Sequence, residues 1–159
     1  MKLETLFLKA VVIFLAIPVL ALCIFVVPEM GKFAAEMVPW LPFVNVLVCI
    51  IFYTSAIAFY IALYQAFNLL RYIDKNIAFS ELSVMALKTI KYCAVIISIL
   101  HVLGLPIFYW VAELDDAPGV IIIGCVVPFA SVVIAVFAAV PLQSLIRFDD
   151  IKSETDLTI

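Results

Sequence analysis

Residues 10–28 read AVVIFLAIPVLALCIFVVP and contain no charged side chain. Three further stretches of the 159-residue chain also lack Asp, Glu, Lys and Arg, namely residues 37–70, 92–112 and 117–146. About 20 helical residues cross the roughly 30 Å hydrocarbon core of a bilayer, so each stretch can span it. Backbone groups in lipid must be paired within their own segment, and no alternation of period two indicates a barrel. The sequence therefore predicts an all-α polytopic membrane protein with four transmembrane helices.

The composition excludes several other classes of protein. Apolar residues make up 68% of the chain, against about 45–50% in a soluble domain. The formal net charge is −3 and no basic patch of DNA-binding size is present, which argues against direct binding of nucleic acid. So apolar a chain is not disordered either. The partner that the composition does imply is the lipid bilayer.

The flanking residues set the expected helix boundaries. We predict an up-down bundle that forms a single membrane domain over residues 1–159, with helices at about 6–28, 40–73, 81–112 and 117–147. Ser80 is expected to N-cap the third helix, and Asp116 the fourth. Between the second and third helices, residues 71–91 would form a cytoplasmic hairpin, and residues 148–159 an acidic cytoplasmic tail.

Lysine and arginine predict the orientation, because short cytoplasmic segments retain them and translocated loops do not. With both termini inside, the outer side holds only Lys32. The cytoplasmic side then holds Lys2, Lys9, Arg71, Lys75, Lys88, Lys91, Arg147 and Lys152. We therefore expect a multi-pass protein of the cell membrane with a cytoplasmic N-terminus and a cytoplasmic C-terminus.

The cytoplasmic face carries the candidate interaction residues, which are Arg71, Lys75, Lys88 and Lys91. The hairpin that contains them has a net charge of +2, whereas residues 147–159 have a net charge of −2. Opposite charges could dock the tail on the hairpin or present both to a partner. The competing interpretation is a solvated tail above a basic loop that anionic lipid holds.

Polar side chains inside the spans form a second group of candidates, namely His101, Tyr64, Gln65, Asn68 and Gln143. With Tyr60, the last four could line a small cavity that opens to the cytoplasm. They could equally make hydrogen bonds between helices, which is the interpretation that we favour. A lone histidine with no acidic residue at its depth is more often a neutral hydrogen-bonded side chain than a proton relay.

Small residues recur every fourth position in two of the spans. They are Ala58, Ala62 and Ala66 in one, and Ser131, Ala135 and Ala139 in the other. Such rows let helix backbones approach closely in lipid. We predict that both rows lie in helix interfaces, within one chain or between the chains of a homo-oligomer.

No constellation for catalysis is visible in the spans. They lack paired carboxylates and a nucleophile with an adjacent base. Cys23, Cys49, Cys93 and Cys125 occur once per helix without the spacing of a metal site. We therefore expect no enzyme and no catalytic, cofactor or metal site.

Several long stretches resemble the domain of unknown function 2975 family of small four-helix bacterial membrane proteins. They are FLKAVVIFLAIPVLALCIFVVP (7–28), ALYQAFNLLRYIDKNIAFSELSVMALKTIKYCA (62–94), DDAPG (115–119) and IKSETDLTI (151–159). The resemblance implies a bacterial cell membrane protein that partners a small cytoplasmic helix-turn-helix regulator of the Cro/repressor type. Our leading hypothesis is accordingly a regulatory or interaction role, and the alternative is a small oligomeric transporter, channel or immunity-type protein.

Overall fold

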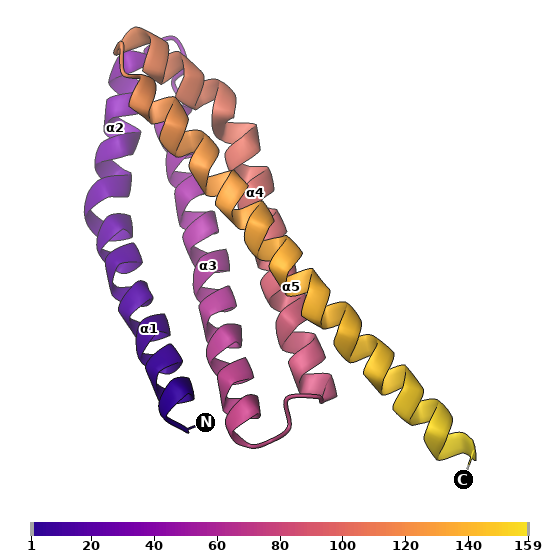
Figure 1. Ribbon diagram of the computed structural model, residues 1–159. Helices are drawn as coiled ribbons and strands as arrows, with labels where there is room; N and C mark the ends of the chain where they lie inside the picture. Colours follow the sequence, from indigo (N-terminus) through magenta and orange to yellow (C-terminus); the bar gives the residue numbers. More distant parts are fainter. Residues whose placement is uncertain (1, 159) are drawn as a thin grey trace.

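Helices account for nearly all of residues 2–158, the part of the chain that this computed structural model describes. The first span combines α1 (Lys2–Ala21), a π-helical turn η1 (Leu22–Val26) and α2 (Val27–Met37). The others are α3 (Val44–Asp74), α4 (Glu81–Leu114) and α5 (Pro118–Thr158), and consecutive spans run in opposite directions (Figure 1). Four of these helical segments are long and apolar enough to cross a membrane, namely Leu3–Met37, Val44–Asp74, Glu81–Leu114 and Pro118–Val136. The prediction of an all-α protein with four membrane spans is confirmed.

The first span is longer than the sequence predicts. We expected it to end at residue 28, whereas the helix continues to Met37. Pro28 does not stop it, because proline is tolerated in the first turn of a helix, and α2 begins at the preceding residue. The π-helical turn just before it changes the hydrogen-bond register where the proline nitrogen has no hydrogen to donate.

Two turns of the same design end α3 and α4. Asn76 (φ 58°) and Asp116 (φ 54°) adopt the left-handed conformation just after the last helical residues. The next residue in each turn donates a backbone hydrogen bond back into the helix, from Ile77 to the Tyr72 carbonyl (2.9 Å) and from Ala117 to the Ala112 carbonyl (3.0 Å). This is the Schellman arrangement. The N-cap predicted at Asp116 is therefore wrong, because Asp116 ends α4 and Ala117 separates it from α5.

The predicted N-cap of α4 is confirmed. The Ser80 side chain accepts a hydrogen bond from the backbone N–H of Ser83 (3.4 Å), and the helix begins at Glu81. Leu82, Met85, Ala86 and Ile90 follow with helical spacing, which predicts an apolar stripe that packs inward, and this prediction is only partly right. Ala86 is buried, but Leu82 and Met85 are exposed. Leu87, outside that stripe, packs instead against Leu145 of α5.

The four spans form an open row and not a closed bundle. α3 packs between the first span and α4, and α4 packs between α3 and α5. Among the described residues, no Cα of α1 or α2 lies within 8 Å of a Cα of α5. Helices converge where the turns 38–43 and 115–117 lie, around a core of Ala34, Val38, Val44, Val48 and Val111. Toward the turn 75–80, called here the hairpin end, α1 and α5 splay apart (Figure 1).

The last helix extends beyond the row. The sequence predicts a helix end near residue 147, but α5 continues to Thr158, and residue 159 lies outside the described residues. No glycine or proline follows Pro141, so nothing in the sequence breaks the helix. The acidic tail is consequently a helical extension that projects from the hairpin end (Figure 1).

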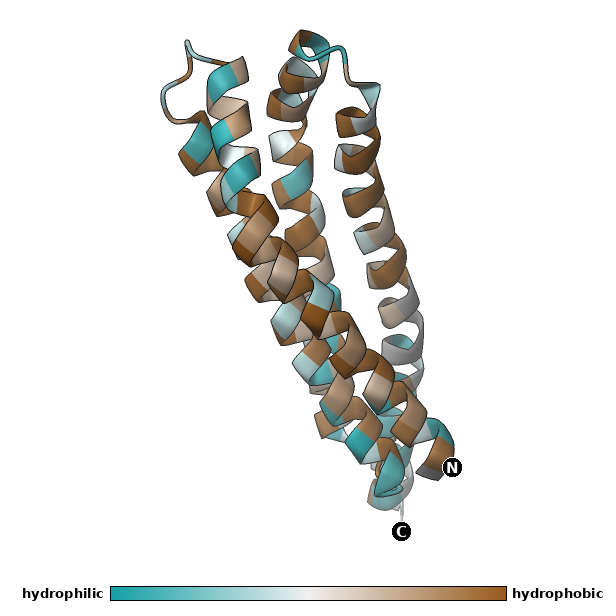
Figure 2. Ribbon diagram, turned by 90° about the vertical axis from the view of Figure 1, so that its left-hand side faces the viewer, coloured by the Kyte–Doolittle hydropathy of each residue, from teal (hydrophilic) through white to brown (hydrophobic). Residues whose placement is uncertain are grey.

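Small residues lie where the helices meet. Ala58, Ser131 and Ala135 are buried, and Ala62 packs against the cluster of Ala58, Cys93 and Ile97. The Ser98 hydroxyl of α4 lies 3.2 Å from the Pro128 carbonyl of α5 and 3.0 Å from that of Ala94. Residues along the middle of the spans are mostly hydrophobic (Figure 2), and many of their large apolar side chains are exposed. Such a surface is stable against lipid and not against water.

Candidate functional site

The basic candidates lie together at the hairpin end. Arg71 and Lys75 sit at the end of α3, whereas Lys88 and Lys91 lie in the first three turns of α4. Arg71, Lys75 and Lys88 are exposed, and Lys91 is half-buried. Within residues 2–158, no ion pair with a described carboxylate is formed by any of the four. Their charges are therefore available to a ligand or partner.

The contact between the turn 75–80 and α5 is apolar. The rings of Phe79 and Phe148 lie 5.2 Å apart between centroids, and both side chains remain largely exposed. Leu145, about one helical turn before Phe148 on α5, packs with Leu87, Leu69 and Val84. The extension past Phe148 is exposed at every described residue. Charge attraction between tail and hairpin, which the sequence suggested, thus produces no ion pair among the described residues.

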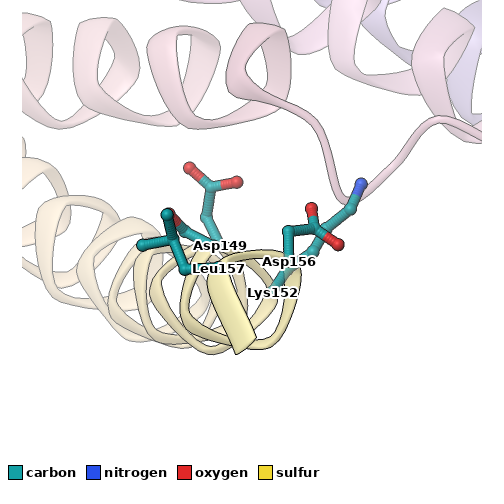
Figure 3. A pocket seen from close by; sticks show the side chains of 5 residues that line it. Asp149, Lys152, Asp156 and Leu157 are labelled. Carbon is teal, nitrogen blue, oxygen red and sulfur yellow. The ribbon is translucent and has the colours of Figure 1, made fainter. Parts of the chain in front are cut away.

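The extension of α5 carries charged and apolar side chains side by side. Asp149, Lys152, Ser153, Asp156 and Leu157 border an open surface hollow of about 410 Å³. These side chains share one face of the helix, with Lys152 and Asp156 toward one edge of that face and Asp149 and Leu157 toward the other (Figure 3). Ile151 is also largely exposed. A helix that exposes both apolar and charged groups in this way offers contact area to another macromolecule.

An ion pair at the hairpin end was missed by the sequence reasoning. Lys9 Nζ of α1 contacts Asp74 Oδ2 of α3, and the two side chains are 22% and 25% exposed. The same ammonium lies 5.8 Å from the ring centroid of Phe67. Lys9 and Asp74 lie near the ends of uncharged stretches, and the sequence places both on the cytoplasmic side. That shared placement is the feature from which the ion pair could have been predicted.

Two tyrosines continue the connection between the first span and α3. The Tyr60 hydroxyl donates to the Ala16 carbonyl (2.7 Å), and the Tyr53 hydroxyl donates to the Cys23 carbonyl (3.2 Å). With the Lys9–Phe67 contact, these pairs recur about every two helical turns along both antiparallel helices. Tyr60 therefore faces α1.

The other polar candidates do not face one common space. Tyr64 is 64% exposed on the outside of α3. Gln143 is exposed on α5, whereas Gln65 and Asn68 are half-buried on α3. Among the described residues, Tyr64 and Gln143 are thus exposed, whereas Tyr60 contacts α1.

His101 lies in the middle of α4 and is only 3% exposed. Its Nδ1 atom is 2.9 Å from the Ile97 carbonyl oxygen and 3.4 Å from Ser55 Oγ. The Phe52 ring meets it edge-on at 5.5 Å between centroids. Since a carbonyl only accepts, the shorter contact requires a proton on Nδ1. The ring also lines an apolar cavity of about 70 Å³ between α2, α3, α4 and α5.

Metal-binding residues are dispersed in the described part of the chain. All four cysteines are free thiols. Across residues 2–158, His, Cys, Asp and Glu side chains form no group of three that could hold a metal ion.

Comparison with known proteins places the chain in a family. Residues 29–159 match the family described as protein of unknown function (DUF2975). The uncharacterized membrane protein YoaS of Bacillus subtilis (strain 168) is 58% identical over 158 residues, and the match covers 99% of each chain. No solved structure matches the chain. With four membrane-spanning helices, a family match over most of its length and so similar a relative, this multi-pass membrane protein belongs to the DUF2975 family.

Proposed function

We propose that this protein is a non-enzymatic regulatory or interaction protein whose hairpin end faces the cytoplasm and binds another protein. The observation that carries the proposal is the composition of that end. Arg71, Lys75 and Lys88 are exposed at the same end of the molecule as the exposed Phe79–Phe148 contact, and the charged extension of α5 projects from that end. Aromatic anchors within a charged rim are typical of protein interfaces.

The distribution of charge supports the cytoplasmic orientation. The N-terminus, the turn 75–80 and the end of α5 lie at the same end of the molecule (Figure 1). Lys32, at the opposite end, is paired with Glu29 at 3.0 Å. The end opposite the hairpin thus keeps no unpaired lysine or arginine among the described residues, as expected of a translocated side.

The buried polar centre supports a non-enzymatic role. Ser55 and His101 are close enough to resemble a nucleophile and its base. The Nδ1 atom that faces Ser55 is however committed to the Ile97 carbonyl as a donor. A protonated nitrogen cannot accept the serine proton, so the pair is better explained as packing and hydrogen bonding within the membrane.

The partner that best fits is a small helix-turn-helix regulator, which the family resemblance implies. The protein would hold such a regulator at the membrane through the hairpin end and the α5 extension. Charged side chains at the hairpin end and on the α5 extension would favour recognition of one partner and fix its orientation. A role as an oligomeric transporter or channel has less support, because Tyr60 is engaged by α1 and Tyr64 faces outward.

The experiment is co-purification from bacterial membranes in mild detergent. We expect the full-length protein to retain a small helix-turn-helix regulator of the kind that the family resemblance implies. An Arg71→Glu, Lys75→Glu, Lys88→Glu variant should lose at least about nine-tenths of it, since each desolvated charge contact contributes roughly 1–2 kcal/mol. Lys32→Glu, at the other end, is the matched control. Absence of the regulator from the wild-type complex, or equal loss in the control, would reject the proposal.

A further inference from the structure

An apolar groove lies at the end of the molecule opposite the hairpin. It has a volume of about 210 Å³ and lies between the turn 38–43, the start of α3 and the outer turns of α4. Its walls are Val38, Trp40, Leu41, Val44, Pro106, Ile107 and Trp110. Val38 and Val44 are buried and Trp40 and Trp110 are half-exposed, so the valines form the floor and the indoles the rim.

The two tryptophans form an aromatic corner. Their ring centroids are 5.5 Å apart with an interplanar angle of 62°, and the side chains are 54% and 50% exposed. This edge-to-face arrangement leaves indole surface uncovered on both sides of the groove. The face of an indole is the most effective aromatic surface for attracting a cation, at up to about 6 Å from the ring centroid.

The charge around the groove is negative. Glu113 is exposed one helical turn beyond Trp110, and Glu36 is exposed two residues before Val38. Asp115 and Asp116 lie exposed in the adjoining turn. The nearby Lys32 is already paired with Glu29. Carboxylates that are not offset by nearby cations raise the local concentration of cationic ligands and repel anionic ones.

We propose that this groove binds a water-soluble organic cation with an apolar tail. The tail would occupy the apolar floor, and the ammonium would lie against the indoles with Glu113 as its nearest carboxylate. Such a ligand also partitions to the membrane interface, where tryptophans at helix ends usually lie. This inference does not depend on the partner proposed for the hairpin end.

The chain contains only two tryptophans, so its intrinsic fluorescence reports on this groove. We would titrate the full-length protein in dodecyl maltoside with hexyltrimethylammonium. Hexanol and hexyl sulfate are the matched neutral and anionic probes. We expect the cation to change the tryptophan emission in a saturable way. Hexanol and hexyl sulfate should cause either no change or a change that does not saturate.

Variants separate the proposed contacts from general effects. Trp110→Leu should weaken the affinity about tenfold while Trp40 still reports binding, and Glu113→Gln about threefold. Tyr109→Leu, an exposed aromatic on the same turn outside the groove, and Glu29→Gln, a carboxylate that is already paired, should leave the affinity unchanged. Circular dichroism identifies any variant that fails to fold, and the exposed Glu113→Gln then carries the test.

Three results would overturn the proposal. Equal saturation with hexanol would mean that the groove is only apolar. Equal weakening by Glu29→Gln and Glu113→Gln would mean a diffuse charge effect. Saturation by phosphatidylethanolamine added to the micelles, before any soluble cation is present, would assign the groove to membrane lipid.

Discussion

Lys9 and Asp74 form an ion pair between the beginning of α1 and the end of α3, with both side chains about three-quarters buried. Among the described residues, α1 packs against one of the other three spans, namely α3, and most of its side chains are exposed. The pair therefore secures the least packed span of the molecule. It also closes a series of contacts that continues through Tyr60 and Tyr53 toward the opposite end.

Breaking this ion pair should destabilise the protein measurably. Lys9→Met removes the Lys9 ammonium from the Asp74 carboxylate, and we expect a loss of about 1–2 kcal/mol, between the values for exposed and buried pairs. Thermal unfolding in detergent measures it. The control is Lys32→Met, which breaks the exposed pair with Glu29 and should cost about 0.5 kcal/mol or less. Equal losses of stability in the two variants would contradict the conclusion that the Lys9–Asp74 pair holds α1 against α3.

A methyl group at Gly31 should be destabilising, because the side chain of Asn45 would have to move. A Cβ atom there would lie 2.2 Å from Asn45 Oδ1 and 3.0 Å from Cys49 Sγ. Gly31→Ala is expected to cost about 1–3 kcal/mol by overpacking. Gly119→Ala is the comparison, because a Cβ at Gly119 meets no atom within 4 Å. Adding Asn45→Ala to Gly31→Ala should recover part of the loss, and no recovery would mean that α2 and α3 are spaced differently.

Removing one tyrosine hydroxyl should weaken the contact between α1 and α3. Tyr60→Phe deletes the hydrogen bond to the Ala16 carbonyl, and we expect a loss of about 0.6 kcal/mol, the average for interhelical bonds in membranes. Tyr64→Phe removes a hydroxyl from an exposed side chain and should be neutral. Chemical denaturation in mixed micelles resolves the two variants, and a larger loss in Tyr64→Phe would show that this face is covered by another chain.

Close packing of α3 on α4 should make Ala58 sensitive to size. Ala58→Leu forces a large side chain between Cys93 and Ile97, at an expected cost of about 1–3 kcal/mol. Ala130→Leu, at an exposed position of α5, is expected to leave the thermal midpoint in detergent nearly unchanged. A neutral Ala58→Leu variant would place this face toward lipid.

The proposed orientation has a direct test with reporter insertions. A fluorescent protein that folds only in the cytoplasm should be bright when inserted after residue 77 and dark when inserted after residue 116. The expectation rests on the lysines and arginines next to the turn 75–80, because short segments rich in these residues are usually retained in the cytoplasm. Alkaline phosphatase at the same two sites should give the opposite pattern. Brightness after residue 116 would reverse the topology.

Much of the fold could be predicted because the responsible forces are local. Uncharged stretches such as residues 10–28 predict membrane spans, since the transfer of apolar side chains and the need to pair backbone groups act within each segment. The N-cap at Ser80 and the packing of the row of small residues that begins at Ala58 follow from similarly local rules. Asp116 was misassigned because a residue that can cap one helix can also terminate the preceding one in the left-handed conformation.

The tertiary structure alone decided which surfaces meet. The sequence established four apolar spans, and it placed charged residues such as Lys9, Asp74 and Glu113 near their ends. It did not determine that the spans form an open row, that Lys9 pairs with Asp74, or that Trp40 and Trp110 enclose a groove. Lipid chains can cover any apolar helix face as favourably as another helix can, so hydrophobicity does not select the neighbours of a helix. That selection depends on steric fit at positions such as Gly31 and on a few polar contacts between distant parts of the chain.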